Sequence, residues 1–130
     1  MEAEVKNQKL SVLIDSGATG NFIKKSVAQK LGIVTNPTKA IKIVHMANKG
    51  TEVVDSTATN MPYKIGDYQA QANFDLIPLA YHDVILGILW LRKINPQINW
   101  AKDVITITEG NNQIVLSSKR SSKVEMVLAM

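Results

Sequence analysis

The chain has 130 residues, 45% of them hydrophobic, with a formal net charge of +4 and no cysteine. This length is typical of one domain, and the hydrophobic fraction is typical of a globular protein rather than a disordered one. The lack of cysteine excludes disulfides, thiolate metal sites and cysteine nucleophiles, and it favours an intracellular location. His45 and His82 are too few for a histidine-rich metal site. No metal and no other cofactor is expected.

Charge and hydropathy also limit the possible partners. The basic residues are scattered, and the densest group, "SSKRSSK" at residues 117–123, has the composition of a flexible tail. Two Trp, three Tyr and two Phe are scarce for stacking on single-stranded nucleic acid, so nucleic-acid binding is not expected and has only the basic charge in its favour. The most apolar run, residues 84–91, is much shorter than the roughly 20 residues of a membrane span. No apolar signal region opens the chain.

The first predicted elements are two short strands, around Val5 and at residues 10–14, joined by the polar turn "KNQK". Apolar residues at positions 22, 23, 27 and 31 then have helical spacing, which predicts a short helix. Asn21 is expected to cap this helix and Gly32 to end it.

Strand patterns dominate the rest of the chain. "AIKIVHMA" and "TEVVDSTAT" flank a turn with a glycine at residues 48–50, and "NMPYKI" and "YQAQANFDLIPL" flank Gly66-Asp67. "DVIL" predicts a short buried strand, and "GILWLRKIN" predicts a helix that Pro96 ends. "QINW" and "DVITIT" form a last hairpin, to which "QIVLS" adds a strand. Short strands with two small helices and no β-α-β alternation predict an all-β barrel or sandwich.

The stretch "LIDSGATGNF", residues 13–22, places Asp15 directly after an apolar strand. Asp-Ser-Gly is common in turns, so a purely structural role for Asp15 stays open. A carboxylate at the end of a buried strand is nevertheless costly without support, and the small residues after it leave room for a ligand. Ser16 lacks the G-x-S-x-G context of a nucleophile, and "GATGNF" lacks the Gly-Lys-Ser/Thr ending of a phosphate loop.

Three segments together carry a family resemblance. "LIDSGATGNFI" resembles the active-site loop of retropepsin-like aspartic proteases, in which Asp-Ser/Thr-Gly-Ala follows an apolar strand. "DVILGILWLRKINPQINW" resembles the downstream segment of these proteases in gypsy-type LTR retrotransposon polyproteins. "VHMANKGTEV" lies between them, where the family carries its flap hairpin. The matches run in the family's order from Leu10 to about Ile107.

The resemblance implies a closed all-β barrel with a flap hairpin and one or two short helices, forming half of a two-fold aspartic protease. It assigns catalysis to Asp15 and an active-site loop to Ser16, Gly17, Ala18 and Thr19. Residues 45–52 would close over a peptide, with substrate contacts from His45, Met46, Ala47, Asn48, Lys49 and Gly50. Packing under the loop is assigned to Ile85, Leu86 and Gly87.

The chain contains only one Asp-Ser/Thr-Gly motif, because Asp55-Ser56-Thr57 lacks the glycine. The resemblance therefore implies a homodimer in which each chain contributes Asp15 and whose peptide substrate is its own polyprotein. Residues 1–116 would be the protease domain and residues 117–130 a linker or tail toward the next segment of a longer protein. The cytoplasm or a virus-like particle is the expected location.

Two residues depart from the pattern of the family. Leu89 and Asn99 stand where retrotransposon members usually have aspartate. They keep a second interpretation open, a catalytically weak or inactive module that dimerises or binds peptides. Trp90 and Trp100 are expected in the core, whereas His45 and His82 are expected to be ordinary strand or surface residues rather than catalytic ones.

Overall fold

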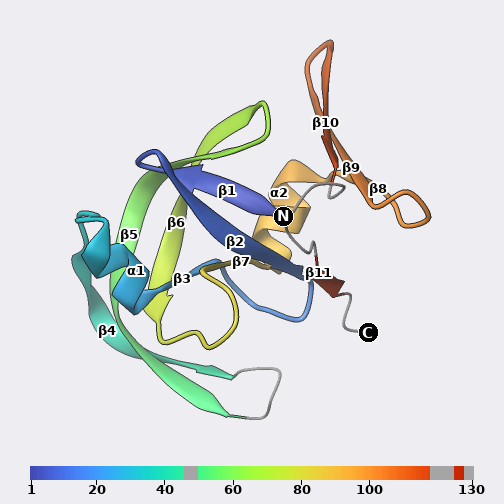
Figure 1. The fold of residues 1–130 in the computed structure, drawn as a ribbon. Coiled ribbons are helices and arrows are strands. Elements are labelled where there is room, and N and C mark those ends of the chain that lie inside the picture. Colours follow the sequence, from blue (N-terminus) through green and yellow to red (C-terminus); the bar gives the residue numbers. More distant parts are fainter. Residues whose placement is uncertain (46–49, 118–124, 128–130) are drawn as a thin grey trace.

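The computed structural model describes residues 1–45, 50–117 and 125–127, the last three by their backbone alone (Figure 1). Eleven strands and two short helices follow one another as β1 (Glu2–Val5), β2 (Gln8–Asp15), β3 (Phe22–Lys24), α1 (Lys25–Lys30), β4 (Asn36–His45), β5 (Thr51–Ile65), β6 (Tyr68–Ile77), β7 (Val84–Leu86), α2 (Ile88–Ile94), β8 (Gln97–Asn99), β9 (Val104–Glu109), β10 (Asn112–Ser117) and β11 (Glu125–Val127). The described helices include none that is long and apolar enough to span a membrane.

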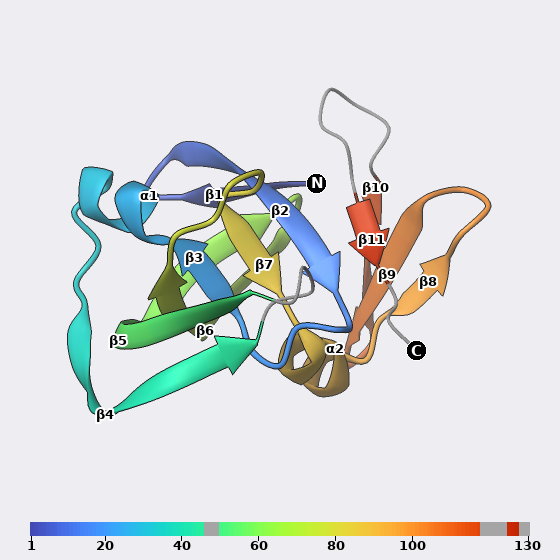
Figure 2. The same ribbon diagram turned by 90° about the horizontal axis from the view of Figure 1, so that it is seen from below.

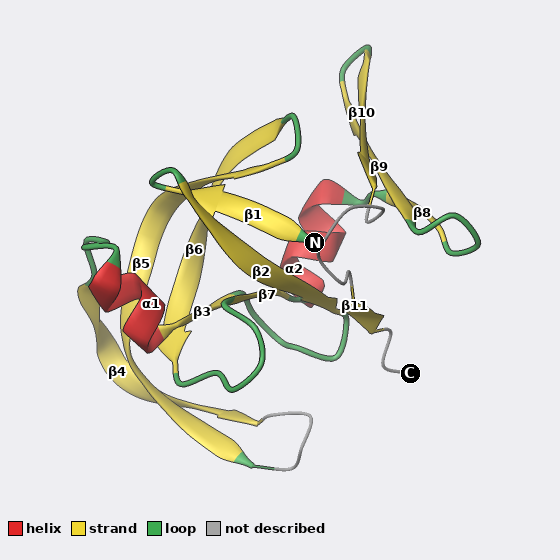
Figure 3. Ribbon diagram, in the orientation of Figure 1, coloured by secondary structure: helices red, strands yellow, loops and turns green. Residues whose placement is uncertain are grey.

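Six of the strands close into a barrel (Figure 3). Their order is β1-β2-β7-β3-β6-β5, and the ring closes where Glu4 of β1 pairs with Lys64 of β5. Strand β4 lies outside the ring and pairs with β5, so that these two strands form the hairpin that extends from the barrel. The predicted all-β barrel with two short helices is confirmed, and the tip of the predicted flap, residues 46–49, lies outside the described residues.

The first hairpin lies where the sequence predicts two short strands joined by a polar turn. Strands β1 and β2 pair antiparallel from Glu2–Ser11 to Val5–Gln8, which leaves Lys6 and Asn7 as a two-residue turn. Both turn residues have positive φ, 51° and 64°, as the right-handed twist of the flanking strands requires of such tight turns.

The predicted helix from residue 22 begins too early. Residues 22–24 form strand β3, which pairs with β6 and β7, and α1 starts only at Lys25. Phe22 and Ile23 are almost completely buried, so pairing within the barrel overrides the helical spacing. The prediction that Asn21 caps the helix is wrong, since Lys24 stands at the N-cap position. The predicted end of the helix is confirmed at Gly32, whose φ is 66°.

Strand β5 is one bent strand where the sequence suggested two. It pairs with β4 in its first half and with β6 along most of its length, and its register shifts between Ala58 and Met61. Asn60 at this shift has a φ of 52°, and its N–H donates to Oδ1 of Asn73 over 2.8 Å. The bend allows one strand to belong to both the projecting hairpin and the barrel.

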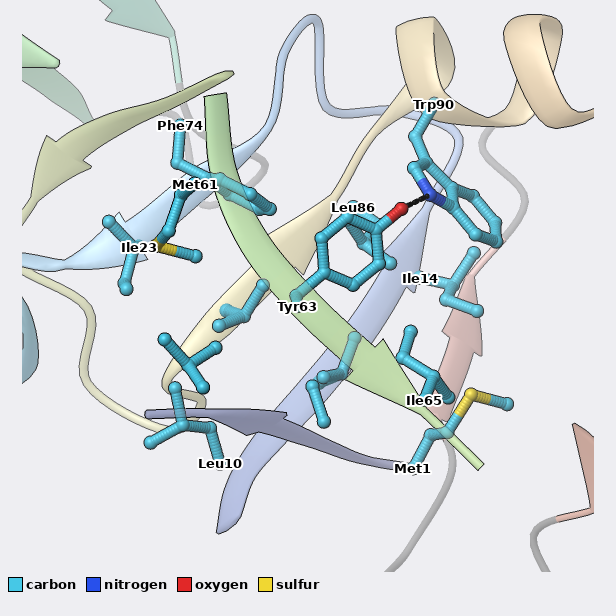
Figure 4. Packing of buried hydrophobic residues seen from close by; sticks show 14 of the residues in the cluster. Met1, Leu10, Ile14, Ile23, Met61, Tyr63, Ile65, Phe74, Leu86 and Trp90 are labelled. Carbon is cyan, nitrogen blue, oxygen red and sulfur yellow. Dashed lines mark hydrogen bonds between the residues drawn. The ribbon is translucent and has the colours of Figure 1, made fainter. Parts of the chain in front are cut away.

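The barrel interior holds the larger hydrophobic cluster, in which side chains from β1, β2, β5, β6, β7 and α2 meet (Figure 4). Tyr63 lies at its centre and accepts a hydrogen bond from Nε1 of Trp90 over 2.7 Å (Figure 4). The core position predicted for Trp90 is confirmed by its 3% exposure. The same prediction for Trp100 is wrong, because this residue lies in the β8–β9 turn and is 48% exposed.

A second sheet of three strands, in the order β10-β9-β8, lies beside the barrel (Figure 2). Ile105, Ile107 and Leu116 of this sheet join the main cluster, so the sheet is anchored to the barrel by apolar contacts. Strand β11 pairs in parallel with the last three residues of β2, Leu13 to Asp15. The boundary predicted at residue 116 stays a prediction.

Candidate active site

Asp15 ends strand β2 and is 8% exposed, which makes it the one buried polar or charged residue in the part of the chain that the structure describes. Its Oδ1 accepts a hydrogen bond from the N–H of Gly17 over 2.8 Å, and its carbonyl accepts from the N–H of Ala18 over 3.1 Å. The carboxylate thus stabilises its own turn. It also lines a cavity, so the turn role does not exclude a chemical one.

The loop after Asp15 is held from below by β7 and the start of α2. Asn21 Oδ1 accepts from the N–H of Gly87 over 3.1 Å, and the carbonyl of Ala18 accepts from the N–H of Ile88 over 2.9 Å. A Cβ on Gly87 would collide with the carbonyl oxygens of Gly20 and Ala18, so only glycine allows this approach.

The residues predicted to pack under the loop lie at this place. Ile85 and Leu86 belong to β7 and are buried, and β7 pairs with both β2 and β3. Ile85 also reaches the cavity beside Asp15.

A second contact fixes β7 against β2. Oδ2 of Asp83 accepts from the backbone N–H of Ser11 over 3.0 Å, and the N–H of Asp83 donates to Ser11 Oγ over 3.1 Å. Asp83 is not part of an Asp-Ser/Thr-Gly motif. Its position directly before a buried strand was the available signal for this structural role.

The cavity above Asp15 has a volume of about 360 Å³. Its walls come from the β2 end and the following loop, from the β4–β5 hairpin and from the segment before β7; the residues are Leu13, Asp15, Gly17, Ala18, Phe22, Val44, His45, Gly50, Glu52, Pro78, Leu79, Ala80, Tyr81, His82 and Ile85. Such a hollow, mostly apolar with a few polar groups, is typical of a ligand site.

The structure brings only part of the predicted site to this cavity. Asp15, Gly17, Ala18, His45, Gly50 and Ile85 line it, whereas Ser16, Thr19, Leu86 and Gly87 do not. The predicted contacts at residues 46–49 lie outside the described residues. Residues 78–82 were missed, and no motif in the sequence marked this segment.

The chain has a positive net charge, but the described residues that line the cavity beside Asp15 do not make it basic. The described lining residues include two carboxylates, of Asp15 and Glu52, and two imidazoles, of His45 and His82, but neither lysine nor arginine. Nowhere in the described ranges do three or more His, Cys, Asp or Glu residues gather as they would around a metal ion.

The two departures from the family pattern lie away from the cavity. Asn99 Oδ1 accepts from the N–H of Lys102 over 3.2 Å and so closes the β8–β9 turn, a role that an amide oxygen fills as a carboxylate would. Leu89 is 58% exposed on α2. Neither residue is among those that line the cavity beside Asp15.

A closed six-stranded barrel, with a buried aspartate in an Asp-Ser-Gly loop below a projecting hairpin, defines the retropepsin-like fold. The chain belongs to the PEG10/RTL1 protease domain family, whose family model matches residues 11–115.

Two further comparisons agree with this fold. The chain is 25% identical over 107 residues to DNA damage-inducible protein 1 of Neurospora crassa. The matched region covers 82% of this chain and 24% of that protein. The chain thus spans about a quarter of the length of this curated relative. The crystal structure of the retroviral protease-like domain of Ddi1 from Leishmania major superposes with a TM-score of 0.67 at 17% identity, covering 91% of this chain and 93% of that one.

Proposed function

We propose that this domain is an aspartic endopeptidase that acts as a homodimer and cleaves the polyprotein of a gypsy-type LTR retrotransposon in which it is encoded. The burial of Asp15 at the edge of a cavity carries the proposal. A carboxylate that served only a turn would be more stable in water, whereas Asp15 is withdrawn from solvent and still borders open space.

The chemistry follows from two such carboxylates. One Asp15 from each chain would face a single water molecule, the first as general base and the second as general acid toward the peptide carbonyl or the leaving amine. Two carboxylates this close do not both ionise readily, so the pair shares one proton, as in aspartic proteases generally. The hydrogen bond from Gly17 supports this arrangement because it fixes the orientation of the carboxylate.

The substrate would be held as an extended strand between the Asp15 loop and the β4–β5 hairpin. Backbone hydrogen bonds would supply most of the affinity, and side-chain pockets would supply selection. We further propose that residues 117–130 link this domain to the next segment of the polyprotein, and that the enzyme works in the cytoplasm or in a virus-like particle.

The test is cleavage of the parent polyprotein by the wild-type chain and by Asp15→Asn between pH 4 and 7. Asparagine has the shape of aspartate and an oxygen for the Gly17 N–H, so the variant is expected to fold but to lose at least about 10³-fold in kcat, since a nucleophile-activating group is gone. Asp67→Asn, in the exposed β5–β6 turn, is the matched control and is expected to cut normally.

An uncut polyprotein with a folded, dimeric wild-type chain would contradict the proposal. The second interpretation, a peptide-binding module without catalysis, would then apply. A pepstatin-type inhibitor separates the two further, because it is expected to bind at mildly acidic pH only where the carboxylate pair forms.

A further inference from the structure

The β4–β5 hairpin carries its side chains in an unusual arrangement. Ile43 and Val53 pair directly across the two strands and are 64% and 56% exposed. The neighbouring residue Glu52 is half-buried and lines the Asp15 cavity. Apolar side chains therefore face water on this hairpin, and a carboxylate faces the cavity, which reverses the usual preference.

The register fixes the direction of Glu52. Glu52 pairs with Val44, and Val54 pairs with Lys42, so these four residues share one face of the hairpin because successive side chains alternate between faces. Val54 is completely buried, which shows that this face is turned toward the barrel. The carboxylate of Glu52 consequently points to the cavity side.

No described residue neutralises this carboxylate. Neither of the two ion pairs in the described part of the chain includes Glu52, and no side-chain hydrogen bond joins it to another described residue. Lys42, the basic residue on the same face, donates instead to Oδ2 of Asp75 over 3.0 Å. The carboxylate of Glu52 is therefore available to pair with a cation on a ligand.

The walls beside Glu52 suit a particular cation. Val44, Leu79 and Ile85 give the same cavity an apolar wall. A lysine or arginine side chain would lay its aliphatic stem along such a surface and bring its charged head to the carboxylate. The segment before β7 adds the side chains of Tyr81 and His82 to the cavity wall, and it adds neither lysine nor arginine.

From this juxtaposition we propose that Glu52 is a specificity-determining residue that selects peptides with a lysine or arginine side chain next to the bond above Asp15. The inference rests on the proposed function, since it assumes that a peptide occupies the cavity. It adds the chemical class of the side chain that the cavity prefers.

The test measures peptide binding rather than cleavage, so that its result is independent of catalysis. Acetylated and amidated octapeptide libraries, with lysine, norleucine or glutamate scanned through each position, are bound to the Asp15→Asn chain at pH 7. We expect one position at which lysine binds about 10-fold more tightly than norleucine, an advantage that shrinks as salt is raised. Acetylation excludes the α-amino group as the cation.

Three variants of the Asp15→Asn chain locate the effect. Glu52→Gln is expected to bring the lysine-to-norleucine ratio of affinities to about one, and Glu52→Lys is expected to make glutamate the preferred residue. Glu109→Gln removes an exposed carboxylate on β9 and is expected to keep the 10-fold ratio.

Equal binding of lysine and norleucine at every position, or a preference for lysine that survives Glu52→Gln, would overturn the inference. Either result leaves the proposed function standing if the wild-type chain cuts its polyprotein. Conversely, a lysine preference that depends on Glu52, in a chain that does not cut, would support the inference and contradict the catalytic proposal.

Discussion

A contact between Asn21 and Gly87 joins the end of the Asp15 loop to the segment after β7. The amide oxygen of Asn21 accepts from the N–H of Gly87, and the missing side chain of Gly87 lets the carbonyl oxygens of Ala18 and Gly20 come close. The position of the aspartate therefore depends on a backbone contact between two distant segments.

Substitution of Gly87 by alanine tests this contact. The new methyl group would lie 2.6 Å from the carbonyl oxygen of Ala18 and would also overlap that of Gly20, so the loop must move. We expect Gly87→Ala to lower the free energy of unfolding by about 2 kcal/mol or more, measured by urea denaturation.

Gly20→Ala is the matched control for this prediction. Its methyl group would meet the Phe22 ring at 3.7 Å, an ordinary contact, so the expected loss is below about 1 kcal/mol. Equal losses in the two variants would show that the close approach at Gly87 has no special importance.

Strand β5 and helix α2 are joined by the hydrogen bond between Tyr63 and Trp90, which is buried in the main core. Burial raises the pKa of the Tyr63 phenol well above its usual value, and burial also raises the pKa of Tyr68 beside it. The folded state therefore keeps these phenols neutral at a pH where the unfolded chain already ionises them.

The sign of the pH dependence follows. Below pH 10 both states hold the phenolic proton and the stabilisation is fully present. As the pH rises above 10, the unfolded state releases its protons first, so the stability falls by up to about 1.4 kcal/mol per pH unit for Tyr63. Urea denaturation of the wild-type chain between pH 8 and 11 measures this fall.

Two tyrosine variants assign the fall to its source. Tyr63→Phe is expected to be about 1–2 kcal/mol less stable at pH 8, because Trp90 loses its acceptor, but to lose less stability from pH 10 upward. Tyr81→Phe, at a side chain that is 91% exposed, is expected to behave as the wild type at every pH. The same alkaline slope in all three chains would contradict the assignment to Tyr63.

Local patterns predicted most of the elements, because the turn residues and the apolar spacing of these elements lie within their own short segments. The β1–β2 hairpin, α2 and the end of α1 at Gly32 are of this kind. Strand β3 was mistaken for the start of a helix because its stability comes from pairing with β6 and β7, which lie more than fifty residues away.

The candidate site also has one part that a local motif predicts and other parts that form only when distant segments meet. The Asp-Ser-Gly loop is a local motif and could be found from the sequence. The bond of Asn21 to Gly87 and the cavity wall at residues 78–82 arise only when distant strands meet, so no short pattern marked them. The inward direction of Glu52 depends on the register with Val44, which the sequence alone left undetermined.

At the scale of the whole molecule, each active site of the proposed homodimer needs an Asp15 from both chains. Mixing the wild-type chain with an equal amount of Asp15→Asn tests this directly. Random pairing leaves a quarter of the dimers with two aspartates, so cleavage is expected to fall to about a quarter of that of the same total amount of wild type. A fall to one half would indicate that each chain works alone.

The pairing of β2 with β7 also determines when the Asp15 loop can form during synthesis of the chain. Ser11 and Asp83, which join these strands, are 72 residues apart in the chain. A ribosome that adds roughly 5–20 residues per second finishes Asp15 several seconds before the residues that support its loop exist. For the proposed endopeptidase this interval is a safeguard during synthesis, because the catalytic carboxylate takes its position only after most of the domain has been made.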